Sequence, residues 1–412
     1  MKTFYLLFFC ISAILPINAF SQINWTVYTT ENSGIFSNTI SDIAAGRDNH
    51  IWFSSSTLGV CRYDQEESWE IFNQENGGTP YNDVWHIAVD SSNNAWIASG
   101  YLVFKTIGLA MINDTGFVSF SSPAPSQIND IVTVDNQIYI GNFSGGYFHY
   151  NGTEFSHYNC DLLANGSNVR VLSFDQSGNL WMGIYETLDI YTITKGVAMH
   201  TGSSWEFYDI GSLIPGGYIR DIEVDQTNVV WVATSIGVIK KEDTSWELLT
   251  TSNSGLPSNN VSCVKISSNN TRWFATDKGL VKFDGIEWVV YDTLNSELPN
   301  NNVNQIEFDY MGNLWGGTAN GIFKIFFPLN KPELTDVSIN VLPNPASERI
   351  ELKGKNILSV ELFDGFGRSN YYRSFQTPME NIIIDLNDIE EGLYMVKIKT
   401  TGGAVVKKVI VL

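Results

Sequence analysis

The chain has 412 residues and a formal net charge of −20 at pH 7, and it contains 34 Gly, 12 Trp, 18 Tyr and 24 Phe. Nucleic acids and anionic membranes are bound mainly through Lys and Arg, so a chain this acidic is expected to bind neither. Many aromatic residues and glycines, with no long apolar pattern of period 3.6, favour an all-β protein.

The amino terminus carries the pattern of a secretory signal peptide. Lys2 gives a positive start, Phe4 to Leu15 form an apolar run, and small residues occur around Ala19 and Ser21. The run is about 12 residues long, short of the roughly 20 that a membrane-spanning helix needs. We therefore expect residues 1–21 to be removed after export and the mature chain to have no transmembrane segment.

An aromatic residue then recurs at a nearly constant interval. The anchors lie 42 to 50 residues apart, at Trp52, Trp96, Tyr139, Trp181, Trp231, Trp273 and Trp315. Short alternating segments and turn residues fill each interval, the pattern of a β-propeller with four strands per blade. Residues 22–328 are therefore predicted to form a seven-bladed propeller, with turn glycines at Gly59, Gly146, Gly237, Gly279 and Gly321.

The first segment of the mature chain is predicted to close this propeller. Six blades have an outer strand with its own pair of large apolar residues, such as Trp288 and Tyr291, but none follows Phe327. The missing pair stands at Trp25 and Tyr28. The N-terminal segment should thus supply the outer strand of blade seven, which removes the exposed edges of an open array.

The phrase that carries the anchor resembles the two-component regulator propeller repeat. It reads DQSGNLWMG at 175–183 and DYMGNLWGGTANG at 309–321, and the resemblance covers residues 23–327. Blade three departs most, with Tyr139 in place of Trp. The resemblance implies the propeller fold and a sensor-like recognition role; phosphorelay signalling does not carry over, because no kinase sequence is visible.

A second unit follows a polar linker at 329–337. Residues 338–412 show strand-length alternation and Gly-rich turns, typical of a small antiparallel Ig-like β-sandwich. They resemble the type A sorting domain of the Bacteroidota type IX secretion system, which implies the type IX machinery as partner and passage through the outer membrane to the cell surface or medium. The matching residues are Pro343, Asn344, Pro345, Gly367, Gly392, Tyr394, Lys407 and Lys408.

Candidate site residues lie where the innermost strands begin. In an up-and-down blade, this end shares a face with the hairpin between strands two and three, which is enlarged in blades two and four. One register there carries Ser41, Trp85, Asn129, Arg170, Arg220, Ser262 and Asn304. The next carries Asp42, His86, Asp130, Val171, Asp221, Cys263 and Gln305.

These rings predict a ligand-binding channel mouth. An aromatic ring beside two arginines could stack on a sugar while pairing with a uronate or sulfate. The expected ligand-binding residues are Trp85, Arg170, Arg220, Asn129, Asn304, Tyr101 and Tyr185. The alternative is that Arg170 and Arg220 only pair with Asp42, Asp130 and Asp221 across the channel.

Three functional hypotheses remain open. The first is a non-enzymatic recognition protein that binds a polysaccharide or a surface protein. The second is a secreted lyase acting on an anionic polysaccharide or cyclic ester, with His86 as base and Asp42 or Asp130 as metal or orienting partner. The third is a structural component of the cell envelope. We expect a monomer without cofactor or metal. The mature chain keeps three cysteines, an odd number that excludes a fully paired disulfide framework, and Cys61, Cys160 and Cys263 are each expected to be small buried packing residues.

Overall fold

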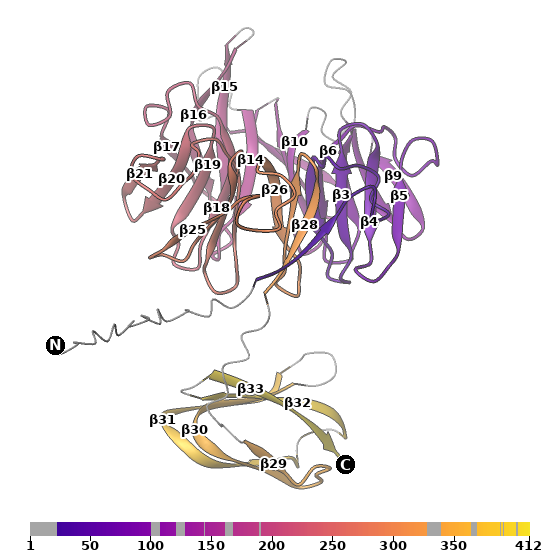
Figure 1. The fold of residues 1–412 in the computed structure, drawn as a ribbon, viewed down its shortest axis with the longest axis vertical. Coiled ribbons are helices and arrows are strands. Elements are labelled where there is room, and N and C mark those ends of the chain that lie inside the picture. Colours follow the sequence, from indigo (N-terminus) through magenta and orange to yellow (C-terminus); the bar gives the residue numbers. More distant parts are fainter. Residues whose placement is uncertain are drawn as a thin grey trace, which may run out of the picture. The chain divides into compact units, whose positions relative to one another are not determined.

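The computed structural model shows two compact units, Ile23–Phe327 and a smaller one that ends at Leu412 (Figure 1). The predicted signal peptide and linker lie outside the residues it describes, as do Tyr101 and Gly367. Within the described chain there is no helix, and so none that could cross a bilayer. The described residues are 23–99, 108–120, 128–143, 145–160, 168–188, 191–327, 339–363, 369–387, 389, 391–400 and 403–412.

The larger unit consists of seven four-stranded antiparallel sheets, which confirms the predicted blades. Blade one comprises β2 (Asp42–Ala45), β3 (Ile51–Ser55), β4 (Gly59–Tyr63) and β5 (Trp69–Phe72). Blade two comprises β6 (Val84–Val89), β7 (Ala95–Ser99), β8 (Gly108–Asn113) and β9 (Gly116–Phe120). Blade three comprises β10 (Ile128–Val134), β11 (Gln137–Asn142), β12 (Tyr147–Tyr150) and β13 (Phe155–Tyr158).

Blades four to seven repeat this order. Blade four comprises β14 (Asn168–Phe174), β15 (Leu180–Leu188), β16 (Tyr191–His200) and β17 (Trp205–Asp209), and blade five comprises β18 (Ile219–Val224), β19 (Val230–Thr234), β20 (Gly237–Glu242) and β21 (Ser245–Leu249). Blade six comprises β22 (Val261–Ile266), β23 (Arg272–Thr276), β24 (Gly279–Phe283) and β25 (Trp288–Tyr291). Blade seven comprises β26 (Val303–Phe308), β27 (Leu314–Thr318), β28 (Gly321–Phe326) and β1 (Asn24–Tyr28).

The ring closes through the amino terminus, as the sequence predicted. Strand β1 pairs antiparallel with β28, and Trp25 lies opposite Ile325. Each innermost strand contacts the innermost strand of the next blade, and β26 contacts β2. The five turn glycines predicted to have positive φ all do; at Gly146 an added Cβ would lie 1.9 Å from the Tyr158 carbonyl oxygen, so only glycine fits.

A carboxylate explains why the phrase DxxGNLW recurs. In blade seven, Asp309 Oδ1 accepts the backbone N–H groups of Met311 and Asn313, which fixes the turn. Its Oδ2 accepts the indole N–H of Trp315 at 3.0 Å. The same aspartate–tryptophan clip joins Asp90 to Trp96, Asp175 to Trp181, and Asp225 to Trp231. The clip satisfies a polar atom inside the apolar contact between blades.

Blade one shows what happens when the clip aspartate is missing. Gly46 occupies the position six residues before Trp52. The indole ring of Trp52 is 1% exposed, and its Nε1 is buried without a hydrogen-bond partner among the described residues. Leaving such a donor unpaired costs free energy, so the clip contributes to blade stability beyond the packing of its ring.

The smaller unit is a sheet of five antiparallel strands around one apolar core. Its strands are β29 (Asn340–Leu342), β30 (Arg349–Phe363), β31 (Ser369–Asp385), β32 (Gly392–Thr400) and β33 (Gly403–Val411). Strand β30 pairs with β29, β31 and β32, and β33 pairs with β32. Its core includes Ile350, Leu362, Tyr394 and Val396, so Tyr394 of the predicted motif is a core residue.

Removing one clip should destabilise the propeller. We expect Asp309→Ala to lower the free energy of unfolding by about 2 kcal/mol, because it leaves the buried Trp315 indole N–H and two turn amides without acceptors. Tryptophan fluorescence during urea denaturation reports this unit alone, because all 12 Trp precede residue 328.

Asp284 provides the control for this comparison. It also accepts two turn amides, those of Ile286 and Glu287, but at an exposed turn and without a tryptophan partner. Asp284→Ala should therefore cost much less stability than Asp309→Ala. Equal losses in the two variants would mean that the indole hydrogen bond contributes nothing.

Candidate functional site

Each innermost strand of blades two to seven begins with a β-bulge. The pairing register shifts by one residue there, for example between Val84 and His86 in β6 and between Val169 and Val171 in β14. A bulge leaves one residue unpaired and redirects its side chain. The unpaired residues are Trp85, Asn129, Arg170, Arg220, Ser262 and Asn304, which is the predicted first ring apart from Ser41.

The bulge residues divide into two kinds. Trp85 is 39% exposed, and Arg170 and Arg220 are also exposed, so these three side chains are available to a ligand. Asn129 is buried, and its Nδ2 donates to the Val169 carbonyl oxygen of the next blade at 2.8 Å. Ser262 makes the equivalent bond to a carbonyl of blade seven. Asn129 therefore holds two blades together instead of facing a ligand.

The two arginines project from the bulges of neighbouring blades, four and five. Burial lowers the pKa of Arg220, and the charge of Arg170 lowers it further, whereas the charge of Asp277 opposes this shift. The guanidinium of Arg170 lies 5.5 Å from the ring centroid of Tyr185, a cation–π distance. Tyr185 is only 1% exposed and donates its hydroxyl to the Ile219 carbonyl oxygen. The ring of Tyr185 thus lies buried beneath the guanidinium of Arg170, and of these two side chains only Arg170 is accessible from solvent.

The structure does not show the internal pairing considered as an alternative for these arginines. Among the described residues neither guanidinium forms a direct ion pair with Asp42, Asp130 or Asp221, and the carboxylate whose charge raises the pKa of Arg220 is Asp277. The carboxylates instead bind backbone amides of two blades: Asp42 accepts from Ile43 and Ile87, Asp130 from Ile131 and Leu172, and Asp221 from Ile222 and Val264. All six bonds measure 2.8 to 3.0 Å.

His86 lies between two of these carboxylates. Its Nδ1 is 3.9 Å from Asp42 Oδ2 and 3.9 Å from Asp130 Oδ1. Burial, with the nearby charge of Arg170, lowers the pKa of His86 to about 4. Burial raises the pKa of Asp42 to about 6, and burial with neighbouring carboxylates raises that of Asp130 to about 7. At neutral pH the imidazole is uncharged and a weak base.

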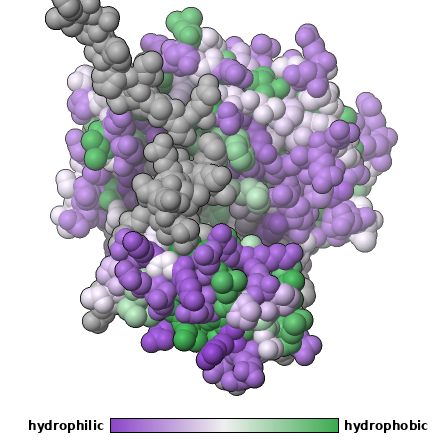
Figure 2. Space-filling model, turned by 60° about the horizontal axis from the view of Figure 1, so that its bottom comes forward, coloured by the Kyte–Doolittle hydropathy of each residue, from purple (hydrophilic) through white to green (hydrophobic). Residues whose placement is uncertain are grey.

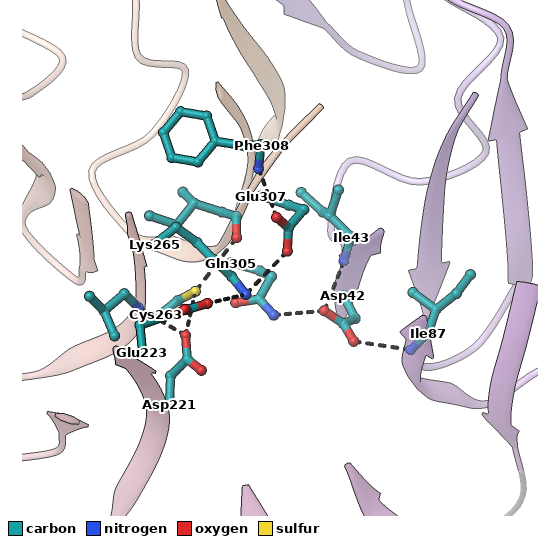
Figure 3. Close-up of polar contacts among 12 residues, drawn as sticks. Asp42, Ile43, Ile87, Asp221, Glu223, Cys263, Lys265, Gln305, Glu307 and Phe308 are labelled. Carbon is teal, nitrogen blue, oxygen red and sulfur yellow. Dashed lines mark hydrogen bonds and ion pairs between the residues drawn. The ribbon is translucent and has the colours of Figure 1, made fainter. Parts of the chain in front are cut away.

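Below this ring lies a cavity that the sequence did not predict. It has a volume of about 390 Å³, and its lining includes Asp42, Asp130, Asp221, Lys265, Gln305, Glu307 and Tyr310. Lys265 Nζ is 3.1 Å from both Glu223 and Glu307 (Figure 3). Gln305 donates to Asp42 at 2.6 Å. None of the exposed bulge residues lines the cavity.

The signal for this network is present but weak in the sequence. Glu223, Lys265 and Glu307 occupy one register, two residues after the second ring, yet blades one and two have alanine there. Only the closed ring shows that the three side chains meet. Within the described chain, no group of three or more His, Cys, Asp or Glu side chains is placed to hold a metal ion.

Exposed apolar residues lie at the same end of the propeller as Trp85, Arg170 and Arg220, the surface that we call the bulge face. They lie in the loops and hairpins that share the face with the bulges, at Leu58, Tyr81, Phe143, Ile193 and Tyr218. The β15–β16 hairpin of blade four extends beyond its neighbours, with Leu188 paired to Tyr191, as its predicted enlargement required (Figure 1). The residues inserted between β7 and β8 lie outside the described chain.

The comparisons with known proteins identify the smaller unit by sequence. Residues 340–412 match the model of a secretion system C-terminal sorting domain. This domain carries the protein through the outer membrane. The three cysteines, Cys61, Cys160 and Cys263, are all buried, as expected, and Cys61 and Cys263 form no disulfide. Comparison with curated proteins finds no match.

Solved structures share the propeller fold. PorZ, a surface component of the type IX secretion system of Porphyromonas gingivalis, is 18% identical with a TM-score of 0.58, over 92% of this chain and 60% of that chain. The extracellular domain of a hybrid two-component system from B. thetaiotaomicron is 15% identical with a TM-score of 0.60, over 94% and 57%. The chain therefore spans about three fifths of these two relatives.

A propeller enzyme is equally similar in fold. Virginiamycin B lyase from Staphylococcus aureus is 12% identical with a TM-score of 0.57, over 74% of this chain and 100% of the lyase. Identities this low show a common fold, and the same fold serves unrelated functions. The activity therefore has to be argued from the side chains of this chain.

The raised pKa of Asp130 makes propeller stability depend on pH. In the folded state this carboxyl holds its proton up to about pH 7, whereas an unfolded aspartate loses it near pH 4. Stability contributed by the proton is present at low pH and is lost as pH rises from about 4 through about 7. Between pH 5 and pH 8, we expect the free energy of unfolding of the wild type to fall by on the order of 2 kcal/mol relative to that of Asp130→Asn.

The measurement is urea denaturation of both proteins at the two pH values. Asp64→Asn is the control, because the Asp64 carboxyl has a lowered pKa and does not titrate between pH 5 and pH 8. A constant difference between wild type and Asp130→Asn across this range would show that the buried carboxyl titrates normally.

Proposed function

We propose that this exported propeller protein, whose residues 340–412 are a secretion system sorting domain, is a recognition protein that binds an anionic polysaccharide on its bulge face. The observation that carries the proposal is the pair of exposed arginines, Arg170 and Arg220, on the bulges of neighbouring blades, where neither guanidinium forms a direct ion pair with a described residue. The chemistry proposed is binding and not turnover.

Two adjacent cations favour a ligand with negative charge. Arg170 disfavours the charged form of Arg220, so their mutual repulsion is a cost in the free protein. A carboxylate or sulfate placed between them would offset this repulsion and accept charge-assisted hydrogen bonds from both guanidinium groups. The whole chain is acidic, but repulsion from distant charges is screened beyond about 8 Å at physiological ionic strength, so the local pair dominates.

Trp85 favours a sugar polymer as the carrier of that charge. Its exposed indole lies on the bulge of blade two, whereas Arg170 lies on blade four. Aromatic rings at exposed sites are suited to stacking on the apolar face of a sugar. A ligand that contacts both residues has to cross blade three, where Asn129 is buried. An extended chain of uronate-bearing or sulfated sugars meets this requirement better than a small anion.

The exposed apolar residues around the arginines support a second candidate, a protein ligand. Five large apolar residues are exposed at this end of the propeller, and exposed apolar surface can mark a protein interface. The relative PorZ is a surface component of a secretion system. The paired arginines nonetheless favour the polysaccharide. A protein partner, or an envelope component with no soluble ligand, would appear as a failure to bind any sugar.

The lyase hypothesis is less well supported by the mouth residues. His86 has the position of a base, but a histidine whose pKa is about 4 accepts a proton poorly at neutral pH. Both oxygens of Asp42 and of Asp130 already bind backbone amides of two blades. These carboxylates hold the ring together, which explains their positions without a catalytic role.

The bulge face can be tested by affinity electrophoresis of the full chain in gels that contain polygalacturonate, chondroitin sulfate or neutral dextran. We expect retardation by the two anionic polymers only. Arg170→Ala should weaken the affinity at least tenfold, because a charge-assisted pair is lost. Trp85→Ala should weaken it about threefold to tenfold through the loss of stacking.

Arg47→Ala is the matched control. Arg47 is an exposed arginine in the turn after β2, at the opposite end of the inner strands from the bulges. Replacing it by alanine changes the net charge by the same amount but leaves the bulges unaltered. Its retardation should equal that of the wild type. If Arg170→Ala and Arg47→Ala behave alike, binding is non-specific and the bulge face is not the site.

Incubation with the same polymers tests for turnover. A lyase would release an unsaturated product with increased ultraviolet absorbance, and we expect none from the wild type. An increase with the wild type that is lost in His86→Ala would replace recognition by catalysis as the function of this face.

A further inference from the structure

The motif at 343–346 lies along the outer edge of the last strand, β33. Asn344 Nδ2 donates to the Lys408 carbonyl oxygen at 2.7 Å, and Asn344 Oδ1 accepts the Ile410 backbone N–H at 2.9 Å. The backbone of Ala346 continues this pairing, donating to the Ile410 carbonyl at 2.8 Å and accepting from Leu412 at 2.7 Å. We name this arrangement the Asn344 clamp. It replaces a neighbouring strand for the end of β33.

The clamp covers only half of this edge. Backbone groups of an antiparallel strand alternate between its two neighbours. Because Ile410 faces the clamp, the N–H groups of Lys408, Val406 and Ala404 face the same side, away from β32. Within the described chain, β33 has no strand partner besides β32 and the parallel bridge between Ala346 and Val411. The segment Ala404–Lys408 therefore presents an open strand edge.

The side chains of the open segment are partly apolar and locally basic. Val406 is 51% exposed, and Lys407 and Lys408 are exposed. Residues 339–412 contain nine Lys and Arg against nine Asp and Glu, so this domain is neutral although the whole chain carries −20. Figure 2 shows exposed hydrophobic residues beside hydrophilic ones on the smaller unit. Lys407 and Lys408 therefore make this stretch of the edge locally basic within a domain that is neutral overall.

We propose that Ala404–Lys408 is a strand-addition site, where an extended acidic segment of the secretion machinery pairs with β33 during export. Backbone hydrogen bonds would provide the affinity of such an added strand, and side chains its specificity. Lys407 and Lys408 select an acidic partner and discourage pairing between copies of this chain, because like charges at an edge repel. The Asn344 clamp fixes where the added strand has to end.

Val406 allows the edge to be blocked without changing the core. Val406→Pro removes the outward N–H, which β32 does not use, and proline is tolerated in edge strands. Val406→Thr is the matched control, because it keeps the N–H and a β-branched side chain. The full chain is produced in a bacterium with an active type IX system, and its amounts in the periplasm and outside the cell are compared.

We expect Val406→Pro to reduce export at least tenfold, with folded protein accumulating in the periplasm, and Val406→Thr to be exported as the wild type is. Thermal unfolding of the periplasmic protein verifies that the domain is folded. Wild-type export of Val406→Pro would overturn the proposal. The same holds if this variant changes only the oligomeric state, since the edge would then pair copies of the chain.

Charge reversal provides a second variant in case the proline prevents folding. Lys407→Glu combined with Lys408→Glu leaves every backbone group in place but repels an acidic strand. Export should again fall at least tenfold, whereas replacing Lys353 and Lys355 by Glu, on β30, should have no such effect. Equal export of the two double variants would overturn the acidic strand as partner.

Discussion

The bonds between inner strands are the constraint on which the site depends. At Asp42, Asp130 and Asp221 a carboxylate binds the backbone amide that follows it and an amide of the next blade. These bonds lie next to the bulges, so the groups that join the blades also fix the direction of the bulged side chains. Burying the carboxylates raises the pKa of Asp42 and Asp130, a cost that their amide bonds partly offset.

The sequence predicted features that follow from periodicity and missed those that require the closed ring. Blade number, closure by β1 and first-ring membership follow from the repeat, and the structure confirms the first two and, apart from Ser41, the third. The bulges leave no such signal, so the separation of exposed Arg170 from buried Asn129 was not predictable. Tyr185 lies in an enlarged hairpin, yet its hydroxyl bonds to Ile219 of the next blade.

The same distinction applies to the aspartate–tryptophan clip and to the inner cavity. The clip is local, since its partners are six residues apart, and the repeated phrase contains both of them. Lys265 and its partners Glu223 and Glu307 come from three blades, with more than 40 residues between neighbours. No short pattern encodes such a contact, because a lysine bracketed by two glutamates appears only when seven sheets close.

The separation of the exposed bulge residues from the carboxylates that join the blades explains why the bulge positions can change without loss of stability. Side chains inside the ring are committed to bonds between blades, so a substitution there would leave buried polar groups unpaired. The exposed bulge residues contribute little to these bonds: Arg170 rests on Tyr185, and Trp85 faces solvent. Such positions can change without disturbing the ring. The exposed bulge residues can therefore vary, whereas His86 lies between two carboxylates that join the blades, so a substitution of either carboxylate would affect both the surroundings of His86 and the ring.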